Sequence, residues 1–224
     1  MMSASTHQAE GIVLQTTPFK DYDRILTLFS PHGLLKFFVK ISKRDYLHSA
    51  ALTSPWTHIE LHYTAGRKDL HRMTEGTILA QNLKLRDRFE TLTAADTMVQ
   101  ALLRSQWQGK PAPKLYILFR LFLEHLPTCE NPQAGATAFL IKILSHEGLL
   151  QLSSELSSPQ PTSRYGGEQY PPSHAPPGSI PFSSAEEALL SQLALSRSLS
   201  HITALTLPAD FQTKIATLFS QVFN

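Results

Sequence analysis

Residues 10–44, EGIVLQTTPFKDYDRILTLFSPHGLLKFFVKISKR, decide the fold that we expect for this chain. The stretch contains three apolar runs with turn-forming residues between them. Pro18, Asp21 and Asp23 precede the second run, and residues 30–33 (SPHG) precede the third. Short apolar runs bounded by such residues are typical of antiparallel strands joined by tight turns. The stretch therefore predicts the opening strands of a small β-barrel.

The third run alternates between apolar and basic or aromatic side chains. Successive side chains on a strand point to opposite faces, so one face is expected to carry Leu35, Phe37, Val39 and Ile41, and the other Lys36, Phe38 and Lys40. On a strand Lys36 and Lys40 lie about 13 Å apart. Cations flanking a flat ring can bind the backbone of a single strand and stack one of its bases. The alternative is an ordinary barrel strand with solvated lysines and a phenylalanine covered by the next domain.

Further cations gather at two predicted loops or strand ends. They are Lys43 and Arg44 after the third run, and Arg67, Lys68 and Arg72 around Gly66. Residues 1–90 hold 12 Lys and Arg against 9 Asp and Glu, whereas residues 91–224 hold 8 against 9. This asymmetry is expected when one part of a protein faces phosphate. The predicted nucleic-acid-binding residues are Lys36, Phe38, Lys40, Lys43, Arg44, Arg67, Lys68 and Arg72.

The order of features in residues 10–90 resembles the RecO family of DNA repair and recombination mediators. Gly-Ile-Val-Leu opens the first strand, a loop leads to Asp23-Arg24, and the next strand ends at His32-Gly33 before a basic strand. The later stretch HIELHYTAGRKDLHRMTEGTILA, residues 58–80, also follows the family pattern. Beyond residue 90 the resemblance rests on helical pattern alone.

The resemblance implies a function and partners that composition and spacing do not. A RecO-like protein would bind single- and double-stranded DNA, promote strand annealing, help load recombinase onto DNA coated by the single-strand-binding protein, and pair with RecR. The acidic, apolar-ended tail of the single-strand-binding protein would need an apolar pocket edged with cations. Arg120 and Lys142, on apolar predicted helices, are the candidates. Alternatively, Arg120 snorkels or pairs with Glu124 one helical turn later.

From about Phe89 the apolar period changes from 2 to 3.6, which predicts helices. Residues 114–126 are apolar almost all round and predict the central helix of a bundle. Other helices are expected over 136–150, from a capping box at 183–187 through Leu195, and over 208–223. The expected fold class is α+β: an oligonucleotide/oligosaccharide-binding (OB-fold) barrel over residues 1–82, followed by an all-α domain over residues 83–224.

A long loop interrupts the predicted helical domain at residues 153–182. This stretch holds 7 of the 15 prolines with several glycines and serines, a composition that cannot supply a packed core. We expect little regular structure there. Many RecO relatives carry a four-cysteine zinc module at about this place, whereas this stretch has no cysteine. No metal is therefore predicted, and a linker without function is the alternative to a binding segment.

Catalytic and metal-binding motifs are not evident. The sequence lacks a phosphate-cradling Gly-rich loop, a GxSxG motif and an HExxH motif, so we expect neither an enzyme nor a cofactor. His58 and His62 resemble metal ligands, but on a strand they lie roughly 13 Å apart and are expected on the solvent face. Asp21 and Asp23 are expected in a turn rather than as an acid–base pair. Cys129 is expected to be a plain thiol.

The chain shows neither a long apolar stretch nor a secretory signal pattern, so no membrane association is expected and the predicted location is the cytoplasm. Two other classes of function stay open at this point. One is a general OB-fold nucleic-acid-binding module that uses its helical half as a scaffold. The other is a non-catalytic protein–protein adaptor, which the modest net charge of +2 permits.

Overall fold

The computed structural model describes residues 6–42, 44, 46–66, 69–150, 163–165, 168–170 and 180–223. The chain divides into two compact units. The first unit comprises Met1–Arg88 and Gln106–Glu124, and the second comprises Phe89–Ser105 and His125–Asn224. We expected residues 106–124 in the helical domain, but they belong with the barrel.

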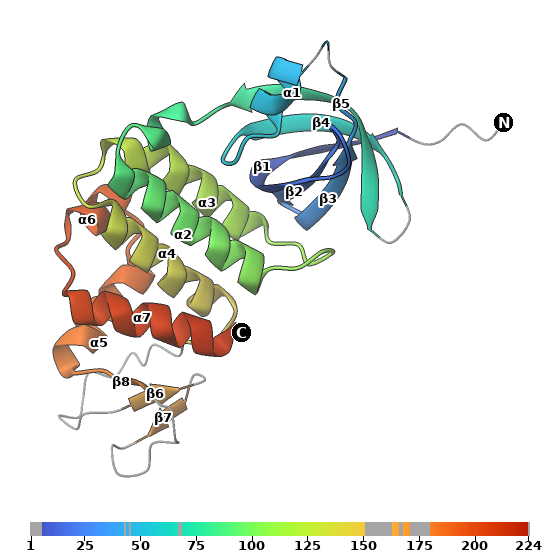
Figure 1. Cartoon of the computed structure of the whole chain (residues 1–224). Coiled ribbons are helices and arrows are strands. Elements are labelled where there is room, and N and C mark those ends of the chain that lie inside the picture. The colour runs from blue at the N-terminus through green and yellow to red at the C-terminus, as the bar shows by residue number, and fades with distance from the viewer. Residues whose placement is uncertain are drawn as a thin grey trace. The chain divides into compact units, whose positions relative to one another are not determined.

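The first unit is built on a closed five-stranded barrel (Figure 1). Its strands are β1 (Thr6–Pro18), β2 (Arg24–Ser30), β3 (Gly33–Val39), β4 (His58–Thr64) and β5 (Leu70–Ala80). They follow one another around the barrel in the order β1-β2-β3-β5-β4, and β3 runs parallel to β5 while the other pairs are antiparallel. The short helix α1 (Tyr46–Leu52) stands between β3 and β4. The predicted OB-fold followed by a helical region is confirmed.

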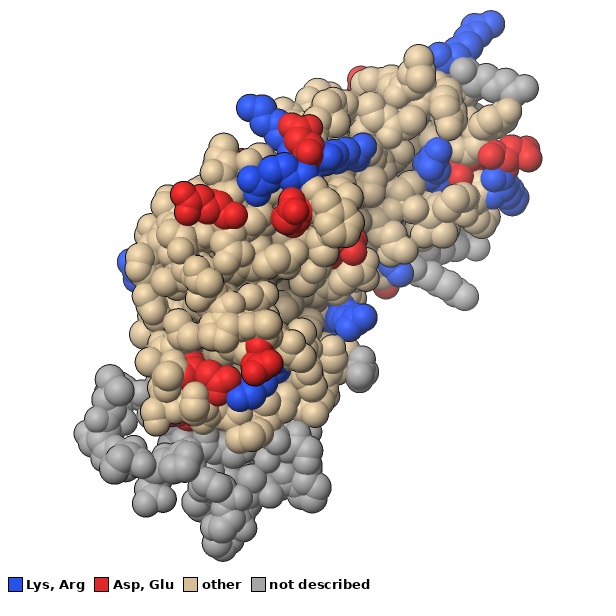
Figure 2. Space-filling view, turned by 60° about the vertical axis from the view of Figure 1, so that its left-hand side comes forward, with Lys and Arg blue, Asp and Glu red and all other residues tan. Residues whose placement is uncertain are grey.

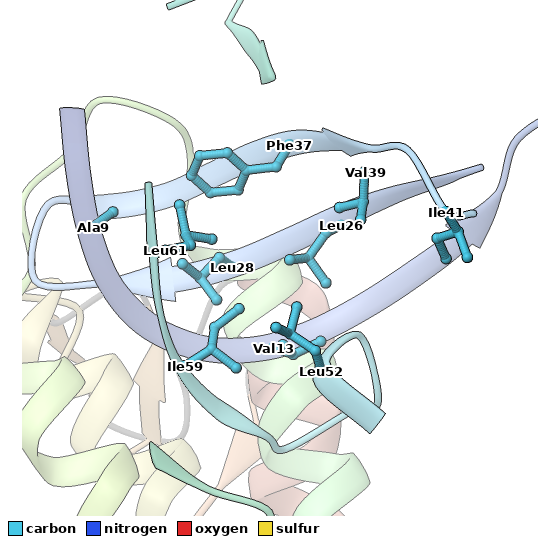
Figure 3. Close-up of a cluster of buried hydrophobic side chains, with 10 residues drawn as sticks. All are labelled: Ala9, Val13, Leu26, Leu28, Phe37, Val39, Ile41, Leu52, Ile59 and Leu61. Atoms are coloured by element: carbon cyan, nitrogen blue, oxygen red, sulfur yellow. The ribbon is translucent and has the colours of Figure 1, made fainter. Parts of the chain in front are cut away.

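Apolar side chains from four of the strands and from α1 fill the barrel (Figure 3). The period of two in the third apolar run is confirmed, because Phe37 and Val39 are buried inside the barrel and Leu35 packs against the same cluster. The fully or nearly fully buried members are Ala9, Val13, Leu26, Leu28, Phe37, Val39, Ile41, Leu52, Ile59 and Leu61. This core fixes which side chains of β3 face outward.

The turn between β2 and β3 needs a glycine. Gly33 has a φ of +94°, and a Cβ at this position would lie 2.3 Å from the carbonyl oxygen of Lys110. The Ser30 hydroxyl donates to the Gly33 carbonyl at 2.9 Å and accepts from the His32 N–H at 3.1 Å. The segment after α2 therefore packs directly on this turn, and Ala112 donates its N–H to the Pro31 carbonyl at 3.0 Å.

Helix α3 (Pro113–His125) covers part of the outer barrel surface. Phe29 of β2 contacts the rings of Tyr116 and Phe119, with ring centroids 6.1 and 6.2 Å away. We expected this apolar helix at the centre of a bundle, and that expectation is wrong. Residues 113–124 of this helix belong to the barrel unit, and the central helix of the second unit is α4 (Pro132–His146). The short 3₁₀ helix η1 (Leu83–Arg86) completes the first unit.

The second unit is helical apart from one small sheet. Its helices are α2 (Phe89–Ser105), η2 (Leu126–Thr128), α4 (Pro132–His146), α5 (Ser184–Leu195), α6 (Leu199–Ala204) and α7 (Ala209–Val222). The central helix is α4, which contacts α2, α5, α6 and α7. Small buried residues such as Ala134, Ala136 and Ala138 let these neighbours approach it. The predicted capping box of α5 is confirmed, since Ser183 and Glu186 each accept the other's backbone N–H.

Part of the expected loop at 153–182 forms a sheet. Strands β6 (Ser163–Tyr165), β7 (Glu168–Tyr170) and β8 (Ile180–Pro181) pair in the order β7-β6-β8. The expectation of little regular structure is wrong for these residues. Strands of two or three residues are too short to produce the alternation that reveals a strand in sequence. Residues 153–162, 166–167 and 171–179 lie outside the described residues.

Candidate nucleic-acid interface

The outward-facing residues of β3 form a strip that we call the β3 strip: Lys36, Phe38 and Lys40, the last just beyond the strand. Both lysines are exposed and Phe38 is half-buried, whereas Phe37 and Val39 between them are buried. This is the cation–aromatic–cation face that the sequence predicts. In an OB-fold, β2, β3 and the loops between β1 and β2 and between β4 and β5 form the usual oligonucleotide-binding face.

Strand β5 adds a third cation beside the ring of Phe38. In the parallel pairing of β3 and β5, Phe38 is opposite Arg72 and Phe37 is opposite His71. The rings of Phe37 and His71 lie 5.7 Å apart inside the barrel, so the neighbouring pair faces outward. Arg72 is exposed. The structure thus brings the predicted residue Arg72 next to the β3 strip.

The loop between β1 and β2, residues 19–23, brings a second ring to the β3 strip. Phe19 meets Phe38 edge to face with centroids 5.8 Å apart, and the Lys20 ammonium lies 5.5 Å from the centre of the Phe19 ring. The Phe19 N–H donates to the Asp23 carbonyl at 2.8 Å. The Asp23 carboxylate accepts the N–H of Ile41, just after β3, at 3.2 Å. Asp23 therefore fastens the loop to the end of β3, in keeping with the turn role expected for it.

The start of α1 contributes another ring. Tyr46, the first residue of α1, meets Tyr22 edge to face with centroids 6.4 Å apart. Both tyrosines are exposed, and so is the predicted cation Arg44. Phe19, Lys20, Tyr22 and Tyr46 are absent from the sequence-based site: the first three lie in a loop, where residues follow no period, and Tyr46 begins a helix of only seven residues. Lys43, Arg67 and Lys68 lie outside the residues that the structure describes.

A polar cluster joins α3 to a different part of the barrel. The Tyr116 hydroxyl donates to Oε1 of Glu10 at 3.0 Å, and Nε2 of His58 lies 2.8 Å from the same oxygen and 3.0 Å from the tyrosine oxygen. We expected His58 on the solvent face, and that expectation is wrong. His58 does point out of the barrel, but Tyr116 covers it. His58 and Tyr116 are 58 positions apart in the chain, and no pattern in the sequence indicates that they meet.

The cluster shifts the pKa values of two of its members. Partial burial acts to raise the pKa of Glu10, but the hydrogen bonds from His58 and Tyr116 outweigh it and leave that pKa below its usual value. Burial and the hydrogen bond to Glu10 raise the pKa of Tyr116. Glu10 therefore accepts as a carboxylate while Tyr116 stays protonated. This arrangement fixes α3 on the barrel.

The chain is similar to proteins of one known family. A model described as "Recombination protein O N terminal" matches residues 2–82. The DNA repair protein RecO of Chlamydia pneumoniae is 32% identical over 222 residues, which cover 96% of this chain and 86% of the relative. The chain belongs to the RecO family. The RecO protein of Chlamydia muridarum is 30% identical over 94% of this chain and 93% of its own length, and that of Myxococcus xanthus is 23% identical over 63% and 58%. The role of the present chain is therefore in DNA repair and recombination.

The two residues expected to bind a partner tail lie in different units of this RecO-family protein. Arg120, on α3 in the first unit, places Nε 3.7 Å from the carboxylate of Glu124, which is the ion pair weighed as an alternative. Lys142, on α4 in the second unit, donates from Nζ to the carbonyls of Ala194 at 3.2 Å and Ser196 at 2.8 Å. Burial lowers the pKa of Lys142. Its ammonium thus binds the carboxyl end of α5.

Metal-binding clusters and membrane-spanning helices are both absent from the described residues of this RecO-family protein. Among them, no group of three or more His, Cys, Asp or Glu side chains is placed to share a metal ion. Within the described part of the chain, no helix is long and apolar enough to cross a membrane. Figure 2 shows a face on which Lys and Arg side chains lie among Asp and Glu side chains. The arrangement that favours nucleic-acid binding is the local one around the β3 strip.

Proposed function

We propose that this RecO-family protein is a DNA recombination mediator that works by binding rather than by catalysis. It binds single- and double-stranded DNA on the barrel face that carries the β3 strip. It promotes annealing of complementary strands and helps load recombinase onto DNA coated by the single-strand-binding protein. The cytoplasm is its proposed location. The observation that supports the proposal most is the open OB-fold face on which Lys36, Phe38 and Lys40 alternate beside Arg72.

The physical part of the proposal concerns phosphate contacts. Lysine and arginine side chains on an open strand face bind phosphates of any sequence, and each phosphate that they neutralise releases counterions. Binding should therefore be independent of sequence and should weaken steeply as salt rises. Lys43, Arg67 and Lys68 stay part of the proposed site because of their positions in the sequence: Lys43 follows β3, and Arg67 and Lys68 precede β5.

The proposed protein partners come from the family and not from the geometry of this chain. They are RecR and the carboxyl-terminal tail of the single-strand-binding protein. For the tail, Arg120 is the better of the two proposed cations, because its side chain is 39% exposed and its ion pair with Glu124, at 3.7 Å, is long. Lys142 already donates to two carbonyls.

The test is fluorescence-anisotropy binding of a labelled single-stranded oligonucleotide across a series of salt concentrations. The variant Lys36→Ala/Lys40→Ala should bind more weakly and should lower the slope of log affinity against log salt by about two units, one for each lost contact. A matched control is Lys84→Ala/Lys114→Ala, which removes the same charge from exposed positions on η1 and α3. The control should keep the wild-type slope.

The same proteins distinguish the alternatives. A protein–protein adaptor would bind no oligonucleotide at low salt, and the β3 variant would behave as wild type. A general OB-fold module would bind DNA but would not accelerate annealing of complementary strands. Salt-sensitive binding together with faster annealing, both reduced in Lys36→Ala/Lys40→Ala, is the result that we expect for a mediator.

A further inference from the structure

We infer that four rings beside the β3 strip form a base-stacking site for single-stranded nucleic acid. We call Phe19, Tyr22, Phe38 and Tyr46 the aromatic cluster. The inference rests on the proposed function and deepens it, because it states which DNA form this face prefers and by which interaction. Only Phe38 in the cluster is evident from the alternation in the sequence.

Three of the four rings are partly exposed to solvent. Phe19 is 39% exposed, Tyr22 44% and Tyr46 41%. Large apolar side chains gain by burial, so their exposure in one neighbourhood marks a binding surface. Single exposed apolar residues need no explanation, but Phe19 contacts Phe38, and Tyr22, from the same loop as Phe19, contacts Tyr46.

The backbone around the rings is fastened in place. The loop carrying Phe19 and Tyr22 is closed by the hydrogen bond from the Phe19 N–H to the Asp23 carbonyl at 2.8 Å. It is tied to the chain after β3 by the hydrogen bond from Ile41 to the Asp23 carboxylate at 3.2 Å. Tyr46 begins α1. A stacking surface held in this way loses little conformational entropy when a ligand binds.

The geometry of the rings leaves stacking surface available. Phe19 and Phe38 pair edge to face, with planes at 89°, and Tyr22 and Tyr46 do so at 79°. An edge-to-face contact covers one face of one ring and only an edge of the other. Neither contact between the paired rings therefore covers both faces of a ring, and the Lys20 ammonium over the Phe19 ring can meet a phosphate beside a stacked base.

The charges around the rings favour nucleic acid over an apolar peptide. The cations near the cluster are Lys20, Lys36, Lys40, Arg44 and Arg72, against the loop carboxylates of Asp21 and Asp23 and that of Asp45, which precedes Tyr46 in the sequence and lies outside the described residues. The Asp23 carboxylate is engaged by the Ile41 N–H. Rings surrounded by cations match the pairing of bases with phosphates in a single strand.

The inference separates single strands from duplexes. Bases in a duplex are stacked on one another, so their faces are not available to the rings, whereas both forms offer phosphates to the cations. Stacking does not release counterions, and phosphate contacts do. Loss of a ring should therefore lower the affinity for single strands without changing the salt slope, while loss of a cation should change the slope for both forms.

The experiment uses the full chain, a labelled single-stranded oligonucleotide and the duplex of the same sequence, each titrated across a salt series. Phe19→Ala, Tyr22→Leu and Tyr46→Ala should each weaken single-strand binding by about 5- to 100-fold, with an unchanged salt slope and little change in duplex binding. Tyr22→Phe keeps the ring and should bind like wild type, whereas Tyr22→Leu keeps apolar bulk without it.

Matched controls come from exposed apolar residues outside the aromatic cluster. Phe89→Ala removes a phenyl ring that is 77% exposed in the second unit, and Leu47→Ala truncates the 83% exposed neighbour of Tyr46 on α1. Both should leave single-strand affinity unchanged. Far-ultraviolet circular dichroism of each variant checks that the loop and α1 changes leave the protein folded.

The outcomes separate the inference from the proposed function. Single-strand binding that is unaffected by all three ring variants, or an equal loss for duplex, would overturn the stacking site while leaving a phosphate-binding mediator in place. An altered salt slope in the ring variants would also overturn it. If the wild type binds no DNA at low salt, the proposed function fails and the stacking site fails with it.

Discussion

At the scale of single residues, the cluster of Glu10, His58 and Tyr116 shows what the sequence does not reveal. Alternation along β4 assigns His58 to the outside of the barrel, but alternation carries no information about a helix that arrives 58 residues later. Burial of the imidazole is acceptable because its Nε2 meets the Glu10 carboxylate at 2.8 Å and the tyrosine oxygen at 3.0 Å. A cluster of this kind fixes α3 in one register on the barrel.

The lowered pKa of Glu10 predicts a dependence of stability on pH. Because its pKa in the folded protein is below the usual 4.5, the carboxylate stabilises the fold fully above pH 4.5, and this contribution is lost as pH falls through the lowered pKa. The side chain is 45% exposed, so solvent screening limits the effect to about 1 kcal/mol or less. In urea unfolding from pH 3 to 7, Glu10→Gln should be less stable than wild type above pH 4.5. The difference should shrink at lower pH, and a difference that stays constant would contradict the assignment.

At the scale of elements, the sequence predicts the strands and their buried faces better than it predicts what each helix packs against. The period of two in residues 34–41 fixes which side chains enter the barrel, because a half-buried strand must alternate. The apolar content of residues 114–126 predicts a helix correctly, but it cannot say whether a barrel or a bundle covers that helix. The aromatic cluster is hidden for a related reason. Phe19 lies near Phe38 through the pairing of β1, β2 and β3, and Asp23 ties the loop of Phe19 to the chain just after β3.

The turn between β2 and β3 offers a test of one element. Gly33→Ala places a Cβ in the left-handed region and 2.3 Å from the Lys110 carbonyl oxygen, so the 106–112 segment must shift. We expect a loss of about 2–4 kcal/mol in the free energy of unfolding. Gly109→Ala is the matched control, because its φ is +76° and a Cβ there meets nothing within 4 Å. It should lose only about 1–2 kcal/mol. If urea unfolding gives equal losses of unfolding free energy for Gly33→Ala and Gly109→Ala, the close approach of the Cβ to Lys110 does not destabilise the fold.

At the scale of the whole molecule, neither unit is a continuous piece of chain. The chain passes between the units after Arg88, after Ser105 and after Glu124. The predicted domain boundary at residue 82 is placed where the spacing of apolar residues changes. That change marks where strands give way to helices, which is a change in local structure. Such a change cannot reveal that residues 106–124 belong to the barrel unit. The contact between Phe29 and Phe119, for example, joins positions 90 residues apart.

This arrangement predicts that the barrel is incomplete without α3. A fragment of residues 1–88 keeps all five strands but loses Tyr116 and Phe119, and so uncovers Phe29, which is fully buried in the whole chain. Exposure of a phenylalanine and loss of the partners of His58 and Glu10 should cost several kcal/mol, a large part of the stability of a domain this small. We expect the fragment to bind the dye ANS and to unfold at a lower temperature than the full chain, with a weak near-ultraviolet dichroism signal. A fragment that unfolds cooperatively with native near-ultraviolet dichroism would mean that the strands alone specify the barrel and that α3 is an addition to its surface.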